Sequence, residues 1–448
     1  MTSASVDVAI VGAGLAGLTA AREIRRQGGE VAVLEAQGRV GGRTLNHAFA
    51  DGTVVELGGQ WVGPTQTRMI ALAAELGVET YPSWDEGEHL IERGGEMRRY
   101  TGETFGLPVS TLLDLGLAQL RIDRLARRVP LEQPWEAPRA RRLDSETAAS
   151  WIRRNVRTKL GRDFLRVVVE AVFSAEPEDL SLLHFLFYLH SGGGLDSLTR
   201  TTGGAQDSRF VGGSQELSSR MAAELGDAVR LSAPVASIHG EVGLVVGGEW
   251  GEVRAERVVV AVPPAVIPRI SFKPSLSGRR AHLHARMPPG YVIKCMARYE
   301  RPFWRDAGLS GQAGSPDRPL AITFDNSPRD NSCGVLLGFL EGGHGRRAAV
   351  LPAAARRNLV LGDLGAYFGA EAREPLEYVE RDWAEDEWIR GGYGAHLGPG
   401  TWTGYGPLLR EPEGPIHWAG AETSPVWNGY MDGAVRSGER VAAEIAAA

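Results

Sequence analysis

A glycine-rich loop near the start of the chain, residues 12–17, constrains the fold more than any other feature of the sequence. It reads Gly-Ala-Gly-Leu-Ala-Gly, which is a G-x-G-x-x-G pattern. An apolar run rich in β-branched residues precedes it at residues 6–11, and apolar residues at helical spacing follow it up to Gly28. A second strand is expected over residues 30–34, with Glu35 at its end. This order of strand, loop, helix and strand predicts a βαβ unit that binds a dinucleotide.

Each position of the loop has its own expected role. Gly12 permits the tight turn, Gly14 lets the backbone approach a pyrophosphate, and Gly17 allows the helix to pack closely on the strand. Leu15 and Ala16 open the helix, whose N-terminal amides would face the phosphates. The alternative is a glycine-rich turn with no ligand. It is disfavoured because the flanking strands, the helix and the acid are all in place.

The segment after the second strand supplies further expected contacts to the nucleotide. Glu35 would accept hydrogen bonds from ribose hydroxyls, and Ala36 follows it. The sequence then reads Gly-Arg-Val-Gly-Gly-Arg over residues 38–43. Arg39 and Arg43 can neutralise a pyrophosphate, and Gly42 can admit it. The alternative here is a solvated basic loop.

Composition and charge set the broad class of the protein. The chain has 448 residues, of which 43% are hydrophobic and 23% charged, so it can bury the cores of two domains. A net charge of −6 disfavours nucleic acid and anionic membranes as partners. Two cysteines, Cys295 and Cys333, permit at most one disulfide, and we expect no metal site.

No membrane or export signal is visible in the sequence. No run reaches the roughly 18 apolar residues of a membrane span, and residues 1–5 lack the start of a signal peptide. We therefore expect a cytoplasmic protein with no membrane partner. An arginine-rich stretch over residues 121–142 has acids among its arginines, and we interpret it as a solvated helical face.

The order of predicted elements indicates two interleaved domains. Strand patterns of the dinucleotide-binding type occur at the start, within residues 210–262, and at residues 416–419 before a closing helix at 433–446. Between them lie predicted helices over residues 112–128, 145–159, 164–173 and 180–190, and predicted strands over residues 293–299 and 335–340. We expect one domain from residues 1–82, 204–287 and 390–448, and a second from residues 83–203 and 288–389.

Further motifs resemble those of the flavin amine oxidases, a family that includes monoamine oxidases and bacterial putrescine oxidases. Besides the loops described above, the matching segments are residues 57–66, 191–195, 210–213, 293–294, 418–423 and 428–434. The resemblance covers nearly the whole chain. It implies an α/β fold of the amine oxidase type, in which an α+β substrate-binding domain is inserted into a discontinuous, Rossmann-like FAD-binding domain.

The resemblance also implies an activity, that of an FAD-dependent oxidase. Hydride would leave the α-carbon of a small primary amine for flavin N5, and the resulting imine would hydrolyse to an aldehyde and ammonia. Oxygen would re-oxidise the flavin and yield hydrogen peroxide. The expected partners are therefore a small amine and oxygen. Assembly into a homodimer is left open.

Three residues match catalytic positions of the family. Lys294 lies in an apolar, alternating stretch where an unpaired ammonium would be costly. The resemblance implies that Lys294 holds a water against flavin N5. Tyr393 and Tyr430 match two tyrosines that form a slot for the amine in front of the flavin. The alternatives are a lysine that extends to solvent and tyrosines that serve only in the core.

Other family motifs imply further FAD contacts. Gly59, Gln60 and Trp61 match residues that border the isoalloxazine ring, and Val235 matches a backbone contact to adenine. The other expected cofactor contacts are Trp383, for which a core role is the alternative, and Gly420, Ala421, Glu422, Tyr430, Met431 and Ala434.

One departure from the animal members of the family concerns how FAD is held. Animal monoamine oxidases carry Gly-Gly-Cys-Tyr where residues 391–394 of this chain read Gly-Gly-Tyr-Gly, and that cysteine binds FAD covalently. Here the cysteine is missing, and Cys295 and Cys333 lie far away in sequence. We therefore expect non-covalent FAD.

The preferred amine is inferred from one position above all. Putrescine oxidases supply a glutamate for the distal ammonium where this chain has Ile322, so a monoamine with an apolar body is favoured. The expected substrate contacts are Phe173, Leu198, Thr199, Gln206, Ile322, Tyr393 and Tyr430.

Three alternatives to a monoamine oxidase remain, and the sequence favours each of them less. A putrescine or polyamine oxidase would need an anion from elsewhere, such as Glu170, Glu176 or Asp325. A flavoprotein that binds without turnover would be favoured by loss of the lysine or the tyrosines, which are present. An amino-acid substrate is disfavoured because Gln60 and Trp61 stand where amino-acid oxidases usually carry an arginine.

Overall fold

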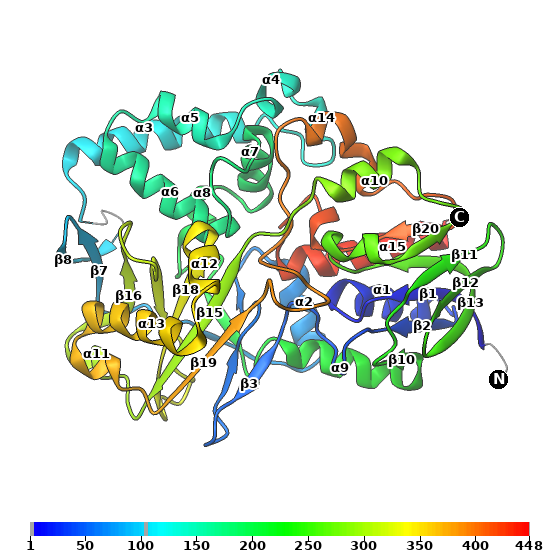
Figure 1. Ribbon diagram of the computed structural model, residues 1–448, viewed down its shortest axis with the longest axis horizontal. Helices are drawn as coiled ribbons and strands as arrows, with labels where there is room; N and C mark the ends of the chain where they lie inside the picture. Colours follow the sequence, from blue (N-terminus) through cyan, green and yellow to red (C-terminus); the bar gives the residue numbers. More distant parts are fainter. Residues whose placement is uncertain (1–3, 103–105, 448) are drawn as a thin grey trace.

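The computed structural model describes residues 4–102 and 106–447, and two large sheets with a layer of helices dominate it (Figure 1). The first sheet has the strand order β10-β2-β1-β13-β12-β11-β14, with β20 paired to β13. Its strands are β1 (Ala4–Val11), β2 (Val31–Leu34), β10 (Val229–Arg230), β11 (Ser237–His239), β12 (Leu244–Gly248), β13 (Gly251–Val260), β14 (Ser271–Lys273) and β20 (Ile416–Trp418).

The centre of this sheet is the predicted βαβ unit. β1 pairs in parallel with β2 and with β13, and α1 (Leu15–Arg26) connects β1 to β2. Ile10, Val33 and Val259 are fully buried, as expected for parallel strands covered on both faces. The prediction of a Rossmann-like unit at residues 6–35 is confirmed.

The second sheet is built from the middle of the chain and is mostly antiparallel, in the order β19-β15-β18-β17-β16-β7-β8. Only its β16 and β7 pair in parallel. Its strands are β7 (Glu88–Arg93), β8 (Glu96–Tyr100), β15 (Val292–Tyr299), β16 (Leu309–Gly314), β17 (Ile322–Asp325), β18 (Gly334–Glu341) and β19 (Glu377–Asp382). It lies at the left of Figure 1, away from the first sheet.

Helices cover one end of the second sheet, above it in Figure 1. The main ones are α3 (Val109–Ala126), α5 (Ala148–Asn155), α6 (Lys159–Phe173) and α7 (Leu182–Ser191). Further helices are α4 (Ala140–Asp144), α8 (Leu195–Thr199), α10 (Gly278–Ala285), α11 (Phe303–Asp306), α12 (Gly342–Ala349), α13 (Ala353–Phe368) and α14 (Thr401–Tyr405). Short strands outside the two sheets are β3 (Asn46–Ala48), β4 (Val54–Glu56), β5 (Trp61–Val62), β6 (Thr80–Pro82) and β9 (Ser208–Phe210).

Two predictions of secondary structure were wrong in part. The single helix expected over residues 145–159 is broken, because α5 ends at Asn155 and Thr158 caps α6 by accepting a hydrogen bond from the Gly161 amide at 3.2 Å. The strand-like region 210–262 contains a helix, α9 (Gln215–Leu225). Its Leu217, Met221 and Leu225 recur every four residues and are buried against the first sheet's core, which is the spacing of a helix.

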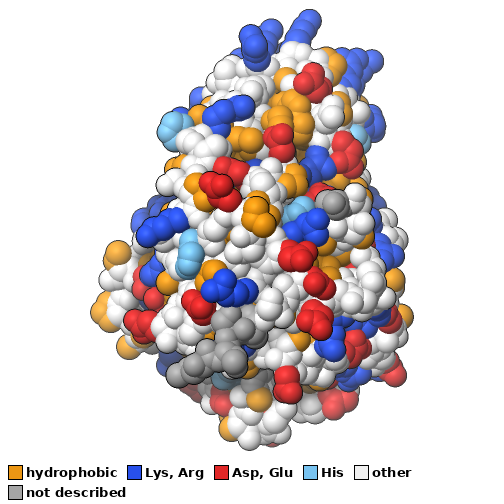
Figure 2. All heavy atoms as spheres, turned by 90° about the vertical axis from the view of Figure 1, so that its right-hand side faces the viewer, with side chains coloured by type: hydrophobic (Ala, Val, Ile, Leu, Met, Phe, Trp, Pro, Cys, Tyr) orange, Lys and Arg blue, Asp and Glu red, His pale blue; other side chains and the backbone are white. Residues whose placement is uncertain are grey.

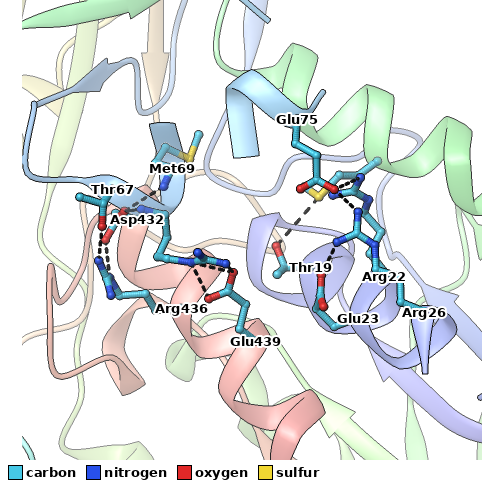
Figure 3. Close-up of polar contacts among 12 residues, drawn as sticks. Thr19, Arg22, Glu23, Arg26, Thr67, Met69, Glu75, Asp432, Arg436 and Glu439 are labelled. Atoms are coloured by element: carbon cyan, nitrogen blue, oxygen red, sulfur yellow. Dashed lines mark hydrogen bonds and ion pairs between the residues drawn. The ribbon is translucent and has the colours of Figure 1, made fainter. Parts of the chain in front are cut away.

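The last helix brings the C-terminal motif back to the glycine loop. α15 (Met431–Ala446) packs against α1 so closely that a Cβ at Gly438 would lie 2.5 Å from the carbonyl oxygen of Ala16. Figure 3 shows the polar contacts around α1, α2 (Thr67–Glu75) and α15. The Asp432 carboxylate accepts hydrogen bonds from the amides of Arg68 and Met69 at 2.8 and 2.9 Å. These contacts fix the start of α15 beside the nucleotide loop.

Charged side chains of both signs are interspersed over much of the face shown in Figure 2. Lys and Arg gather at its upper end, near α3 to α5 in Figure 1. The seven arginines of residues 121–142 are all exposed, as predicted for a solvated face.

In the described ranges, no helix combines the length and apolarity that crossing a bilayer requires.

Candidate active site

A cavity of about 660 Å³ runs between the two sheets and the helical layer. One part is lined by the glycine loop and its neighbours, and another by β15, β17, α6 and α8. The predicted site residues that line it are Gly12, Gly14, Leu15, Ala16, Glu35, Ala36, Gly42, Arg43, Gly59, Gln60, Trp61, Leu198, Thr199, Gln206, Val235, Lys294, Ile322, Trp383, Tyr393, Gly420, Ala421, Tyr430, Met431 and Ala434. The fold thus brings together most of the residues predicted from the sequence.

The glycine loop divides into positions that the fold requires and one that it leaves open. Gly12 has a φ of +104°, and a Cβ at Gly17 would lie 2.0 Å from the Gly12 carbonyl oxygen. A Cβ at Gly14, by contrast, would meet nothing nearer than the Gly41 carbonyl oxygen at 3.9 Å. Gly14 faces the cavity and is the N-cap of α1, where no side chain caps the helix. This point therefore has room for a phosphate group, and the amides at the start of α1 are free to bind it.

Glu35 is held in place at the end of β2. Its carboxylate accepts hydrogen bonds from the amides of Ala13 at 2.7 Å and Gln37 at 2.9 Å. Burial raises the pKa of Glu35, and these amides oppose the rise. The carboxylate also lines the cavity, so it can accept hydrogen bonds from ribose hydroxyls.

An ion pair between half-buried Arg43 and buried Glu422 connects the loop after β2 to the C-terminal motif. Arg43 donates to both carboxylate oxygens of Glu422, at 2.5 and 3.0 Å, and to the carbonyl oxygen of Tyr393 at 2.9 Å. Burial opposes ionisation of Glu422, but the charge and hydrogen bonds of Arg43 outweigh it and hold its pKa below the usual value. Bidentate geometry of this kind fixes orientation as well as charge. Tyr393 is thereby attached to the nucleotide loop.

Lys294 is buried in β15, with 3% of its surface exposed. Its Nζ donates to the Gly58 carbonyl oxygen at 2.8 Å and to Oε1 of Gln60, and it lies 5.8 Å from the Trp61 ring centre. Burial lowers the pKa of Lys294 to about 7, with a raising effect from Glu56 and a lowering one from Arg209. The side chain therefore does not extend to solvent, and it can gain or lose a proton near neutral pH.

The two predicted tyrosines line the cavity from different segments. Tyr430 precedes α15 and packs edge-on against Trp427, with ring centres 4.9 Å apart. Tyr393 packs at right angles to Phe339, with ring centres 5.9 Å apart. Burial raises the pKa of both phenols well above the ordinary value, and proximity to Tyr430 contributes to the rise at Tyr393. Both rings stay neutral phenols, which suits aromatic walls around an amine.

The region beyond the tyrosines is largely apolar. Ile322 and Phe324 line it from β17, and the Trp61 and Phe324 ring centres lie 5.0 Å apart. α6 contributes a further stripe at helical spacing, to which the sequence analysis assigned no role in the site: Leu160, Phe164, Val167, Val168 and Ala171. Helical spacing alone cannot distinguish a cavity wall from a packed core.

A polar group that the sequence did not reveal also lines the cavity. Asp85 accepts hydrogen bonds from Gln312 at 2.6 Å and Thr202 at 3.1 Å, and its oxygen lies 4.0 Å from His89. Residues 85, 202 and 312 come from three distant segments. No local pattern connects them, so no sequence signal could have grouped them.

The chain is similar to known proteins over nearly its whole length. The family described as flavin containing amine oxidoreductase matches residues 15–446. The chain belongs to this family. AofH of Mycobacterium tuberculosis, a protein assigned as a flavin-containing monoamine oxidase, is 44% identical over 99% of this chain and 97% of its own.

Solved structures of amine oxidases have the same fold. Putrescine oxidase bound to putrescine superposes with a TM-score of 0.96 at 38% identity, covering 99% of both chains. Cyclohexylamine oxidase from Brevibacterium oxydans IH-35A superposes with a TM-score of 0.95 at 34% identity, again covering 99% of both chains. The protein is therefore a flavin-containing amine oxidase with FAD as its cofactor, and the predicted family, fold class and cofactor are confirmed.

The residues at the cavity fit this cofactor. The open position at Gly14, the uncapped start of α1 and the Glu35 carboxylate form a cradle for a dinucleotide, and Gly59 and Trp61 lie farther along the wall. Val235 and Met431 also line the cavity.

Four predicted site residues do not line the cavity. Gly17 packs against the Gly12 carbonyl. Glu422 accepts hydrogen bonds from Arg43, which does line the cavity. Arg39 donates to carbonyl oxygens of its own loop, at Gly42 and Thr44. Phe173 packs behind the wall, with its ring centre 4.4 Å from that of Tyr188. Their assignment as direct contacts stays a prediction.

The three acids considered as distal anions also lie outside the lining. Asp325 accepts hydrogen bonds from Trp304 and Arg305, at 2.8 and 2.7 Å. Glu176 pairs with Arg346, and Glu170 lies 3.6 Å from Arg166. Each acid has a partner of its own, so none is presented to a substrate from its place in the fold.

Proposed function

We propose that the enzyme is a monoamine oxidase whose substrate is a primary amine with an apolar body. The observation that carries the proposal is the wall at Ile322, a half-buried aliphatic side chain in one apolar cluster with Phe324 and Trp61. A second ammonium group would lose its hydration there and find no anion. A hydrocarbon chain or ring would be stabilised by the same surface.

We propose the following division of work among the side chains. When bound, FAD supplies the acceptor for the hydride that leaves the amine, and oxygen then takes the electrons to give hydrogen peroxide. Tyr393 and Tyr430 orient the neutral amine with their ring faces. Lys294 holds a proton or a water at Nζ, since a pKa of about 7 keeps both of its protonation states accessible. The oxidised amine hydrolyses to an aldehyde and ammonia.

A second candidate is oxidation of a diamine such as putrescine. The Asp85 carboxylate favours it, because this group lines the cavity and carries a negative charge. Asp85 is engaged by neutral donors rather than by an arginine, so it could receive a distal ammonium from a long diamine. The apolar side chains that line the same cavity, Ile322 and Phe324 among them, weigh against a short diamine.

One experiment separates these candidates. Purified protein is mixed without oxygen with benzylamine, phenylethylamine, tyramine, putrescine or spermidine, and bleaching of the flavin is followed by absorbance. Monoamine oxidation predicts bleaching by the first three amines only. Bleaching by putrescine or spermidine alone would replace the proposal with the second candidate, and no bleaching by any amine would contradict both.

We propose that FAD is bound non-covalently. Cys295 and Cys333 are both buried as free thiols, and neither is among the residues that line the cavity. Acid precipitation of the purified protein is therefore expected to leave the yellow colour in the supernatant. Colour that stays in the washed pellet would contradict the proposal.

We also propose the domain division at residues 1–82, 204–287 and 390–448 against 83–203 and 288–389. All strands of the first sheet fall in the first set of segments, and all strands of the second sheet fall in the second. A cytoplasmic location and a homodimer stay predictions. Sedimentation equilibrium of the purified protein tests the dimer, since the monomer mass is 48.2 kDa.

A further inference from the structure

Glu341 is a buried carboxyl group directly behind a cavity tyrosine. It is the last residue of β18, and 4% of its surface is exposed. One of its oxygens, Oε1, accepts a hydrogen bond from the Tyr393 hydroxyl at 2.6 Å and another from the Ser174 hydroxyl at 3.2 Å. Glu341 is not among the cavity-lining residues, so it can reach a substrate only through Tyr393.

The loop that carries Tyr393 is fixed on its other side by the backbone. The amide of Gly392 donates to the Gly290 carbonyl oxygen at 3.0 Å, and the amide of Gly290 donates to the Gly394 carbonyl oxygen at 3.1 Å. A Cβ at Gly290 would lie 2.4 Å from the Gly392 carbonyl oxygen, so the two segments are in close contact. The backbone contacts position the Cα of Tyr393, and the bond to Glu341 positions the far end of its ring.

Folding alone does not account for a carboxyl group in this place. Among the described residues, no lysine or arginine forms an ion pair with Glu341. Burial raises the pKa of Glu341 to about 8; the hydroxyls of Tyr393 and Ser174 oppose the rise, and the charge of Glu170 adds to it. An apolar side chain here would avoid the cost of desolvating a carboxylate. What the carboxyl group provides in this place is an acceptor for the hydrogen bond from the Tyr393 phenol.

We propose that Glu341 is a positioning residue for Tyr393, which holds the phenol hydroxyl and so sets the angle at which the ring faces the substrate amine. This inference rests on the proposed role of Tyr393 in the amine slot. Once Glu341 is ionised, above its pKa of about 8, a hydrogen bond from the phenol to the carboxylate is stronger than one between neutral groups, so it restricts the ring more tightly. It also draws the phenol proton away from the oxygen and makes the ring face more electron-rich, which favours the amine nitrogen.

Flavin reduction in a double-mutant cycle tests the coupling. Glu341→Leu leaves the Tyr393 hydroxyl without its acceptor, and we expect the rate of anaerobic flavin reduction by the preferred amine to fall about tenfold. Glu341→Gln keeps a neutral acceptor at the same place and is expected to lose only about threefold. In a Tyr393→Phe background, both substitutions are expected to change the rate by less than about twofold, since the hydroxyl is already gone. Equal losses in the two backgrounds would overturn the proposal.

Glu170→Gln is the matched control, because Glu170 is a neighbouring buried carboxyl that does not bond to Tyr393. We expect it to change the reduction rate by less than about twofold. Flavin content and melting temperature of every variant show whether a loss reflects misfolding. A loss in the control as large as that in Glu341→Leu would assign the effect to general packing.

A spectroscopic measurement keeps the inference testable apart from turnover. Carbon NMR of protein labelled at tyrosine Cζ, with Tyr393 assigned from the phenylalanine variant, reports the hydroxyl bond without any amine. The Tyr393 resonance is expected to titrate near pH 8 in the wild type and not in Glu341→Leu. Titration that persists in this variant would overturn the inference, whereas a protein that no amine reduces but that shows the expected titration would contradict only the proposed function.

The titration has to be interpreted with the other charges around Glu341 in view. The titratable and charged groups on the elements packed around it include Tyr393, Glu170, Arg166, Glu176, Arg346, His344 and, on the paired strand β15, Lys294. Glu170 and Lys294 both have pKa values near that of Glu341, because burial raises the pKa of Glu170 to about 7 and lowers the pKa of Lys294 to about 7. Glu170→Gln and Lys294→Met therefore separate these two titrations from that of Glu341.

Discussion

At the scale of single residues, the site depends on polar groups that the fold keeps out of water. Lys294 and Glu341 are both buried, and neither has an oppositely charged side chain as its hydrogen-bond partner in the described structure. Such groups cost stability and are retained where chemistry needs a proton to move at neutral pH. The two lie in or behind the wall of one cavity, on neighbouring strands of the second sheet.

The lowered pKa of Lys294 predicts how stability depends on pH. Between pH 7 and about 10, the unfolded chain binds a proton at this lysine that the folded protein does not, so stability rises with pH there. Relative to Lys294→Met, the free energy of unfolding is expected to rise by up to about 1.4 kcal/mol per pH unit in this window and to be level below pH 7. Urea unfolding at pH 6, 7, 8 and 9 with fixed FAD measures it. Parallel pH profiles for the two proteins would contradict the prediction.

Ile322 allows a direct test of substrate preference. Ile322→Glu places a carboxylate in the apolar wall, so we expect putrescine to reduce the flavin at least about tenfold faster and phenylethylamine at least about tenfold slower. The ratio of the two reduction rate constants in stopped-flow measurements reports the change. Ile322→Leu keeps the wall apolar and is expected to preserve the wild-type ratio. The prediction fails if glutamate and leucine shift the ratio alike.

At the scale of elements, the sequence was informative where a pattern is local. The βαβ unit, the strands over residues 293–299 and 335–340 and the closing helix could be predicted because apolar spacing and glycine signals lie within each segment. α9 was missed because it lies between strands and its buried stripe has only three members. The break before α6 was missed because the capping contact at Thr158 also involves Asp114, 44 residues away.

The candidate site, like the helices and strands, could be predicted only where its residues stand in local motifs. The lysine, the tyrosines and the glycine loop stand in motifs, whereas the contacts that organise them cross the chain. Arg43 and Glu422 are 379 residues apart, and Glu341 and Tyr393 are 52 apart. The sequence offered no local pattern for either pairing, nor for the place of Asp85 in the cavity wall.

Two glycines of the loop are expected to respond differently when a methyl group is added. Gly17→Ala would place a Cβ 2.0 Å from the Gly12 carbonyl oxygen, so the protein without FAD is expected to melt several degrees lower. Gly14→Ala meets no protein atom within 3.8 Å, so the melting temperature without FAD is expected to stay within about 2 °C of wild type. Its Kd for FAD, measured by fluorescence titration, is expected to rise at least about tenfold because the methyl group enters the phosphate cradle. Unchanged FAD affinity in Gly14→Ala would contradict the assignment of the cradle.

At the scale of the whole molecule, the cofactor cavity is where distant segments meet. Its wall takes residues from the glycine loop, from Val235, from Lys294 in the second sheet and from Tyr430 before the last helix. A ligand that fills this cavity would contact residues of both sheets at once. Its binding energy is therefore added to the stability of the assembled chain.

This arrangement predicts that FAD stabilises the whole fold. At a free FAD concentration 100 times its Kd, stabilisation is expected to be about 2.7 kcal/mol relative to the protein without FAD, and the melting temperature is expected to rise with FAD concentration. Differential scanning calorimetry across an FAD series measures the rise, with riboflavin, which lacks the nucleotide half, as the comparison. A melting temperature that does not respond to FAD would contradict a site shared between the sheets.

The contact of Arg43 with both Glu422 and the Tyr393 carbonyl has a practical consequence for anyone who modifies this enzyme. Its guanidinium group lies beside the cradle for the phosphates and at the same time supports the loop of the substrate slot. Attempts to exchange the cofactor for an altered flavin and attempts to reshape the amine pocket therefore converge on the same side chain. Changes to one specificity are best selected together with the other.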